Sequence, residues 1–105
     1  MPPLILSLAI LVASASAAFA QDPGDPQAGF NMAQHVCAKC HGISAEPSPL
    51  PEALRFREVA DQKGMTGTAL TVWMQTSHPT MPNIVLTKQD TLDVVAYILS
   101  LKGRE

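Results

Sequence analysis

The sequence contains two cysteines, and both lie in the stretch C-A-K-C-H at residues 37–41. Two residues separate Cys37 from Cys40, and His41 follows directly. Residues three apart on a helix are close neighbours, so the two thiols are expected to face the same side. The next residue then directs its imidazole toward the same region. This spacing predicts one site that uses all three side chains.

Cys-x-x-Cys-His is the motif of c-type haem attachment. The two thiols can reach the two vinyl groups of one porphyrin and form thioethers. The adjacent imidazole is then held in place to bind the iron. We therefore predict one haem c, bound covalently through Cys37 and Cys40, with His41 as an axial iron ligand.

Three other kinds of site use paired thiols. A thioredoxin-like dithiol needs a strand before its first cysteine, and no strand pattern precedes Cys37. A closed zinc site needs four ligands, and only Cys37, Cys40 and His41 stand together. A structural disulfide is compatible with an oxidising compartment. Haem attachment is favoured because the motif is specific and contains every cysteine of the chain.

The first twenty residues have the pattern of a secretory signal peptide. An apolar run, residues 4–12, leads to Ala18-Phe19-Ala20, the A-x-A pattern of a cleavage site. No Lys or Arg precedes the run. Residues 4–20 are at the lower edge of the length of a membrane span, so an N-terminal anchor is the alternative. We predict a signal peptide over residues 1–20, one domain over residues 21–105, and export to the periplasm.

The predicted mature chain is small and nearly neutral. A domain of this size often needs a disulfide, a metal or a cofactor to complete its core. The net charge is −2, and no basic patch of the kind that binds nucleic acid is apparent. We therefore expect no nucleic-acid partner.

Hydrophobic periodicity predicts helices and no strands, so the predicted fold class is all-α. The expected helices span residues 26 to about 40, 52–60, 68–76 and 87–102. Asp25 as N-cap and Pro26 as first residue start the first helix. Thr87 and Asp90 resemble a capping box at the start of the last helix, and Gly103 ends it.

Four segments together resemble the small class I cytochromes c of bacteria. They are residues 29–42 around the motif, the proline-rich loop that follows, H-P-T-M-P-N at 78–83, and D-V-V-A-Y-I-L-S-L-K at 93–102. The resemblance implies the cytochrome c fold, in which the N- and C-terminal helices cross around one covalently bound haem. It also implies that Gly29 lets these helices approach closely and that Tyr97 packs at their crossing.

The second axial ligand has several candidates. They are Met32, Met65, Met74, Met81, His35 and His78. Met32 and His35 lie on the attachment helix, which disfavours them, and Met74 lies in an apolar helical stripe typical of core packing. Met81 lies in a loop stiffened by two prolines, and Met-Pro at this position matches the axial methionine of the family. We predict Met81 as the ligand, with His78 as the alternative.

The resemblance further implies a hydrogen bond from His41 to a proline carbonyl in the loop after the motif. Pro49 and Pro51 are the candidates for that carbonyl. Leu54-Arg55 stands where related proteobacterial sequences are expected to carry a proline pair, which leaves the course of the loop open.

Trp73, Arg55 and Arg57 have two interpretations each. Trp73 either reaches a haem propionate or fills the core. The two arginines either pair with propionates or form part of a solvated face.

His/Met ligation fills both axial positions, and the soft thioether favours Fe(II) and raises the reduction potential. We therefore expect an electron carrier rather than an enzyme. It would act as a monomer, exchange electrons with donor and acceptor proteins, and meet a membrane only through partner complexes. The alternative is a haem c subunit of a periplasmic dehydrogenase or oxidoreductase complex, which would show an extra apolar surface patch. A haem sensor with one labile axial position is a third possibility.

Overall fold

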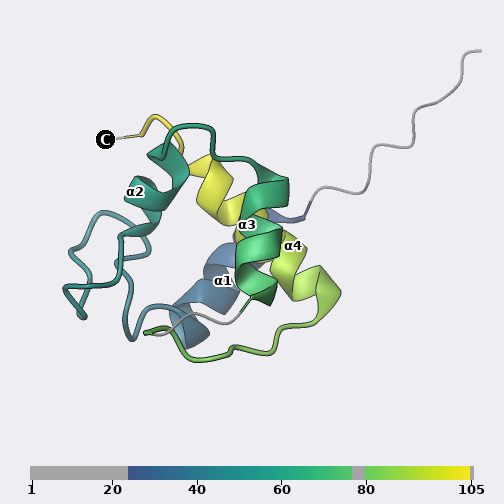
Figure 1. Ribbon diagram of the computed structural model, residues 1–105, viewed down its shortest axis with the longest axis horizontal. Coiled ribbons are helices and arrows are strands. Elements are labelled where there is room, and N and C mark those ends of the chain that lie inside the picture. Colours follow the sequence, from purple (N-terminus) through teal and green to yellow (C-terminus); the bar gives the residue numbers. More distant parts are fainter. Residues whose placement is uncertain (1–23, 77–79, 105) are drawn as a thin grey trace, which may run out of the picture.

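The computed structural model describes residues 24–76 and 80–104. Within these residues there are four helices and no strand (Figure 1). The helices are α1 (Pro26–Val36), α2 (Phe56–Asp61), α3 (Gly67–Gln75) and α4 (Lys88–Ser100). The predicted all-α class is confirmed.

The first helix ends earlier than its sequence pattern predicts. Cys37 is the C-cap of α1, and residues 37–40 form a turn rather than a last helical turn. Within this turn the backbone N–H groups of Cys40 and His41 both donate to the Cys37 carbonyl, at 3.1 and 2.9 Å. The expected helix through Cys40 is therefore wrong at its end. The hydrogen bonds of the turn nevertheless keep the backbone of Cys40 next to that of Cys37.

The second helix also begins later than predicted, at Phe56 instead of residue 52. Residues 47–51 include three prolines, which hold the chain in an irregular loop up to Arg55. The predicted N-caps of the first and last helices are confirmed. The Asp25 carboxylate accepts the N–H of Gln27 at 2.9 Å, and the Thr87 hydroxyl accepts the N–H of Asp90 at 3.1 Å.

Helices α1 and α4 run across one another and form the main helix contact of the described structure (Figure 1). Gly29 lies at this contact: a Cβ there would be 1.9 Å from the Asp93 carbonyl oxygen and 2.8 Å from the Tyr97 Cβ. The Phe30 and Tyr97 rings pack beside it with centroids 5.3 Å apart. The expected roles of Gly29 and Tyr97 are both confirmed.

A buried carboxylate ties the start of α1 to α4. Asp93 accepts the backbone N–H of Asp25 at 2.8 Å and the side-chain amide of Gln89 at 2.9 Å. Gly24 lies so close to α4 that a Cβ would be 2.0 Å from the Leu92 carbonyl oxygen. The entry of α1 is therefore fixed by hydrogen bonds as well as by packing.

The core is apolar and joins all four helices to the loop after the motif. Tyr97 of α4 connects the core to this loop, because its hydroxyl donates to the Ile43 carbonyl at 2.5 Å. The buried members of this core are Ala33, Cys37, Ile43, Phe56, Ala60, Leu70, Val94, Val95, Tyr97, Ile98 and Leu101. The end of α1, and with it the cysteine motif, is thus anchored in the core through Cys37.

The loop after the motif is held by its own side chains. The backbone N–H of Gly42 donates to the Ser48 hydroxyl at 2.9 Å. The Glu46 carboxylate accepts the N–H of Ile43 at 3.0 Å and that of Ser44 at 3.3 Å. Hydrogen bonds from the backbone of Glu46 itself, of Ile43 and of Ser44, with the nearby Arg57 charge, hold the pKa of Glu46 below its ordinary 4.5.

Gly29→Ala should lower the free energy of unfolding by about 2 to 3 kcal/mol, because the added methyl group overpacks the α1–α4 contact. Urea unfolding of the haem-loaded protein measures the change. Gly67→Ala is the matched control, since its Cβ would meet Leu99 at an ordinary 3.6 Å. Equal losses of stability in the two variants would contradict the close-approach role of Gly29.

Glu46→Gln should destabilise the protein at neutral pH by less than about 1 kcal/mol, because the carboxylate is exposed and screened. A lowered folded pKa gives stability that is present above the unfolded value of 4.5 and lost as the pH falls through the folded pKa. The difference between wild type and variant should therefore close below pH 4.5. Urea unfolding between pH 3 and 7 tests this, with Glu52→Gln measured in parallel as the control for removal of one exposed carboxylate. A difference for Glu46→Gln that persists below pH 4.5 would contradict the lowered pKa.

Candidate functional site

The two cysteines have different surroundings within one turn. Cys37 is buried, Cys40 is half-buried, and both are free thiols. Burial, and secondly the neighbouring Cys40, raises the pKa of the Cys37 thiol from 9.0 to about 11. Cys37 is therefore a neutral thiol at pH 7. The element before it is helix α1, and not the strand that a thioredoxin-like dithiol requires.

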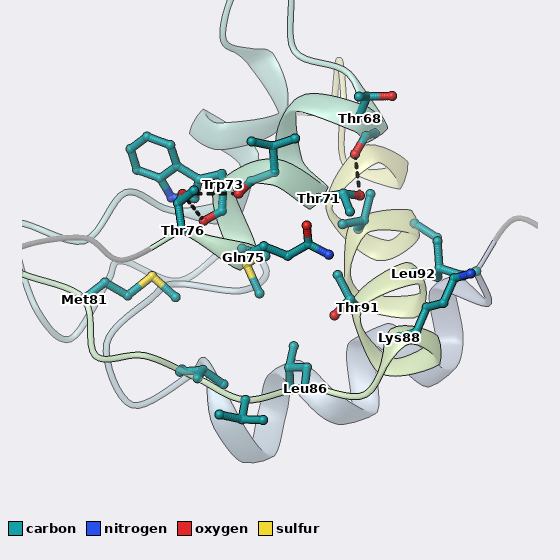
Figure 2. A pocket seen from close by; sticks show the side chains of 18 of the residues that line it. Thr68, Thr71, Trp73, Gln75, Thr76, Met81, Leu86, Lys88, Thr91 and Leu92 are labelled. Atoms are coloured by element: carbon teal, nitrogen blue, oxygen red, sulfur yellow. Dashed lines mark hydrogen bonds between the residues drawn. The ribbon is translucent and has the colours of Figure 1, made fainter.

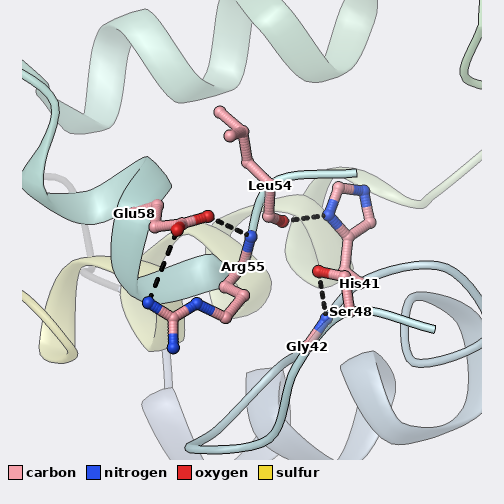
Figure 3. Close-up of polar contacts among 6 residues, drawn as sticks. All are labelled: His41, Gly42, Ser48, Leu54, Arg55 and Glu58. Carbon is pink, nitrogen blue, oxygen red and sulfur yellow. Dashed lines mark hydrogen bonds and ion pairs between the residues drawn. The ribbon is translucent and has the colours of Figure 1, made fainter. Parts of the chain in front are cut away.

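The imidazole of His41 has a fixed orientation. Its Nδ1 lies 2.6 Å from the Leu54 carbonyl oxygen (Figure 3). A carbonyl oxygen only accepts hydrogen bonds, so Nδ1 carries the proton and donates it. The lone pair of the neutral ring is then on Nε2, the nitrogen that remains for a metal. The Phe56 ring packs beside the imidazole with centroids 5.3 Å apart.

The acceptor is Leu54, so the assignment to Pro49 or Pro51 is wrong. Any residue can supply a carbonyl, and what matters is the course of the loop. Two backbone hydrogen bonds set that course: Leu50 donates to Cys40 at 3.1 Å, and Phe56 donates to Gly42 at 2.8 Å. Leu54 stands at the position where related sequences were expected to carry a proline. This departure was the one sign in the sequence that the loop takes a different course.

Arg55 is the N-cap residue of α2. Its backbone N–H donates to the Glu58 carboxylate at 3.0 Å, and its guanidinium pairs with the same carboxylate at 3.4 Å (Figure 3). Arg55 therefore contributes to the start of α2, directly after the carbonyl that orients His41. The Arg55 side chain is 40% exposed in this ion pair, which agrees with the predicted solvated face.

A cavity of about 1010 Å³ lies between α3, the segment 81–88 and α4 (Figure 2). Each of these three segments contributes apolar side chains, such as Val72, Leu86 and Val95. Met81 is half-buried and lines this cavity. The residues that line it do not include Cys37, Cys40 or His41.

The other candidate axial ligands occupy different environments. Met32 and Met65 pack against the core. His35 is exposed, and its Nδ1 lies 2.7 Å from the Asn31 carbonyl oxygen. Met74 is half-buried on α3 and lines the same cavity as Met81, which the sequence pattern did not indicate. His78 lies outside the described residues.

Trp73 and Arg57 lie at two different places in the molecule. Trp73 is 58% exposed and lines the large cavity, so it does not fill the core (Figure 2). Arg57 instead lines a second pocket beside Tyr97 and Ser100, and that pocket shares no lining residue with the large cavity.

These residues fit a covalently bound haem in their chemistry. Two free thiols three residues apart provide the attachment, and an oriented imidazole follows them. A thioether side chain, Met81, lines an apolar cavity. Over the described residues, no group of three or more His, Cys, Asp or Glu side chains is arranged to hold a metal ion by itself.

Comparison with known proteins agrees with this chemistry. Residues 26–102 match the family described as Cytochrome c. The chain is 30% identical over 100 residues to cytochrome c-552 of Bradyrhizobium diazoefficiens, covering 94% of this chain and 90% of that protein. No solved structure matches significantly. With two cysteines that suit covalent attachment, the chain belongs to the cytochrome c family as a small class I c-type cytochrome that carries covalent haem c.

Proposed function

We propose that this chain is a periplasmic electron carrier with one haem c and His/Met axial ligation. Cys37 and Cys40 hold the haem by two thioether bonds, and His41 and Met81 bind the iron. Haem iron, when bound, supplies a one-electron Fe(III)/Fe(II) couple. Donor and acceptor redox proteins are its partners, and the carrier acts as a monomer.

The orientation of His41 carries this proposal. The Leu54 carbonyl takes the Nδ1 proton at 2.6 Å, which leaves Nε2 as the basic nitrogen and limits rotation of the ring. The backbone hydrogen bond from Phe56 to Gly42 fixes the position of the nearby Leu54. The imidazole is therefore oriented before haem binds. A carrier benefits from such a preformed ligand, since little rearrangement is then needed between redox states.

Met81 supports the carrier over an enzyme. Its thioether is neutral and soft, which favours the reduced iron and raises the potential. With His41 and Met81 both bound to the iron, no coordination position would be left for a substrate. The half-buried position of Met81 at an apolar cavity suits a ligand that must be kept from water.

The exposed apolar side chains also favour a carrier over a fixed subunit of a complex. Among the described residues, the large apolar side chains that are most exposed include Val72, Trp73 and Val85, and all three line the large cavity. Leu54, which is 44% exposed, supplies the backbone carbonyl that accepts the hydrogen bond from His41. In the proposed carrier these side chains would surround the haem, whereas a fixed subunit would need a further patch elsewhere.

The proposed periplasmic location rests on the first twenty residues, with cleavage after Ala20 and a mature chain of residues 21–105. These twenty residues lie outside the described part of the chain. No helix that the structure describes has the length and apolar character to cross a membrane.

The mass of the exported protein should equal residues 21–105 plus one haem, under denaturing conditions. Cys37→Ser and Cys40→Ser should each keep one thioether, and the double variant should lose covalent haem. Mass spectrometry of protein exported by a host with a haem-attachment system decides both points. Haem that leaves the unmutated protein on acid extraction would contradict the attachment, and a membrane-bound chain starting at Met1 would contradict the cleavage.

Met81→Ala should abolish the charge-transfer absorption of Met–Fe(III) ligation near the infrared edge, allow carbon monoxide to bind, and lower the reduction potential. Met74→Leu is the matched control, because it removes the other thioether at the same cavity while nearly conserving volume. It should leave all three properties unchanged, and so should His78→Ala.

Loss of the band in Met74→Leu with retention in Met81→Ala would assign the ligand to Met74. Loss of low-spin ligation only in His78→Ala would assign it to His78. Ready carbon monoxide binding by the unmutated protein would contradict the filled coordination and with it the carrier function.

A further inference from the structure

A second pocket, of about 390 Å³, lies where the start of α1, the loop after the motif, α2 and the end of α4 meet. Arg57 and Arg104 line it, together with Ser44, Tyr97 and Ser100. Tyr97 of α4 and Leu101, the C-cap of α4, line this pocket, whereas Val95 and Leu99 of α4 line the large cavity. Residues four apart share a helix face, so the two pockets use opposite faces of α4.

Arg57 is the unusual residue of this pocket. It is half-buried, and its Nε is buried without a hydrogen-bond partner among the described residues. A buried guanidinium N–H that lacks an acceptor costs stability, and native structures leave few such groups. In the described part of the chain, the ion pair within 4.0 Å joins Arg55 and Glu58 and involves neither arginine of the pocket.

The hydroxyl groups of the pocket already use their protons. Tyr97 donates to the Ile43 carbonyl at 2.5 Å, and Ser100 donates to the Tyr97 carbonyl at 2.5 Å. The Ser44 hydroxyl lies 3.4 Å from the Tyr97 hydroxyl oxygen. Gln27 also lines the pocket, and its side-chain amide donates to the Asn31 side-chain oxygen at 3.4 Å. The charged donors left for a ligand are therefore the two guanidinium groups, and two cations with spare N–H groups select an anion.

We propose that this pocket binds a small free oxyanion, a phosphate or carboxylate group, between Arg57 and Arg104. The planar fork of a guanidinium matches two oxygens of such a group. The half-buried position of Arg57 strengthens its contact with the anion, and the exposed Arg104 contributes a second positive charge. The chain has a net charge of −2, so general attraction does not draw anions to it, and binding depends on this local pair of cations.

Glu46 is the internal competitor for Arg57. The Arg57 charge is one of the causes that lower the pKa of the Glu46 carboxyl, which places the two groups within electrostatic reach. The Glu46 carboxylate is exposed and bonded to the backbone N–H groups of Ile43 and Ser44. It neutralises Arg57 only in part, and its removal should strengthen the attraction for an external anion.

Nuclear magnetic resonance of the reduced, haem-loaded protein tests the site directly. Inorganic phosphate and, separately, acetate are titrated at constant ionic strength set with chloride. The Arg57 Nε–H resonance is followed in the unmutated protein, and the backbone amide resonances of Ser44, Ser100 and Leu101, which line the pocket, are followed in every variant. Saturable shifts are expected. Arg57→Gln should remove the site, Arg57→Lys and Arg104→Gln should each weaken binding roughly tenfold, and Glu46→Gln should tighten it several-fold.

Arg55→Gln is the matched control. Arg55 lies two residues before Arg57 and carries the same charge, but its side chain pairs with Glu58. It should leave the phosphate affinity unchanged. Saturation by phosphate alone identifies a phosphate group as the ligand, and saturation by both probes identifies any oxyanion. Shifts that follow chloride equally, equal weakening by Arg55→Gln, or an Arg57 resonance already bonded to a haem propionate would overturn the proposal.

Discussion

The close approach of α1 to α4 at Gly29 is the constraint on which the site depends. Without a side chain at this position, the two backbones come near enough for Tyr97 to pack on Phe30 and to reach Ile43 with its hydroxyl. The same contact fixes the direction in which α1 ends. Since the cysteine motif begins at the C-cap of α1, the helix crossing determines where the haem-binding turn lies relative to the core.

The site itself is built largely from backbone groups. The Cys37 carbonyl closes the turn that carries the motif, and the Leu54 carbonyl orients His41. Gly42 is required between them, because a Cβ there would be 2.2 Å from the Glu46 carbonyl oxygen. This explains why the motif could be predicted from sequence and the acceptor could not. A thiol or an imidazole is visible in the sequence, whereas every residue carries a carbonyl and only the loop course selects one.

The same distinction accounts for the rest of the comparison between sequence and structure. The all-α class and the caps at Asp25 and Thr87 follow from local chemistry, and all were predicted correctly. The end of α1 was placed too late because the apolar pattern continues through the motif while Cys37 already ends the helix. Met74 was read as core packing, since an apolar stripe does not distinguish a core from a cavity wall.

Tyr97 has several structural roles in this small domain. It packs against Gly29, anchors the loop at Ile43, and lines the pocket with Arg57, while Phe56 connects it to the ring of His41. The Phe56 ring lies 5.3 Å from the imidazole and 6.3 Å from the Tyr97 ring, measured between centroids. A substitution at Tyr97 would therefore disturb the fold, the loop and the pocket with Arg57 together. Arg57 and Met81 each line only one of the two pockets, so their functions can be separated by mutation, which a residue in the shared core does not allow.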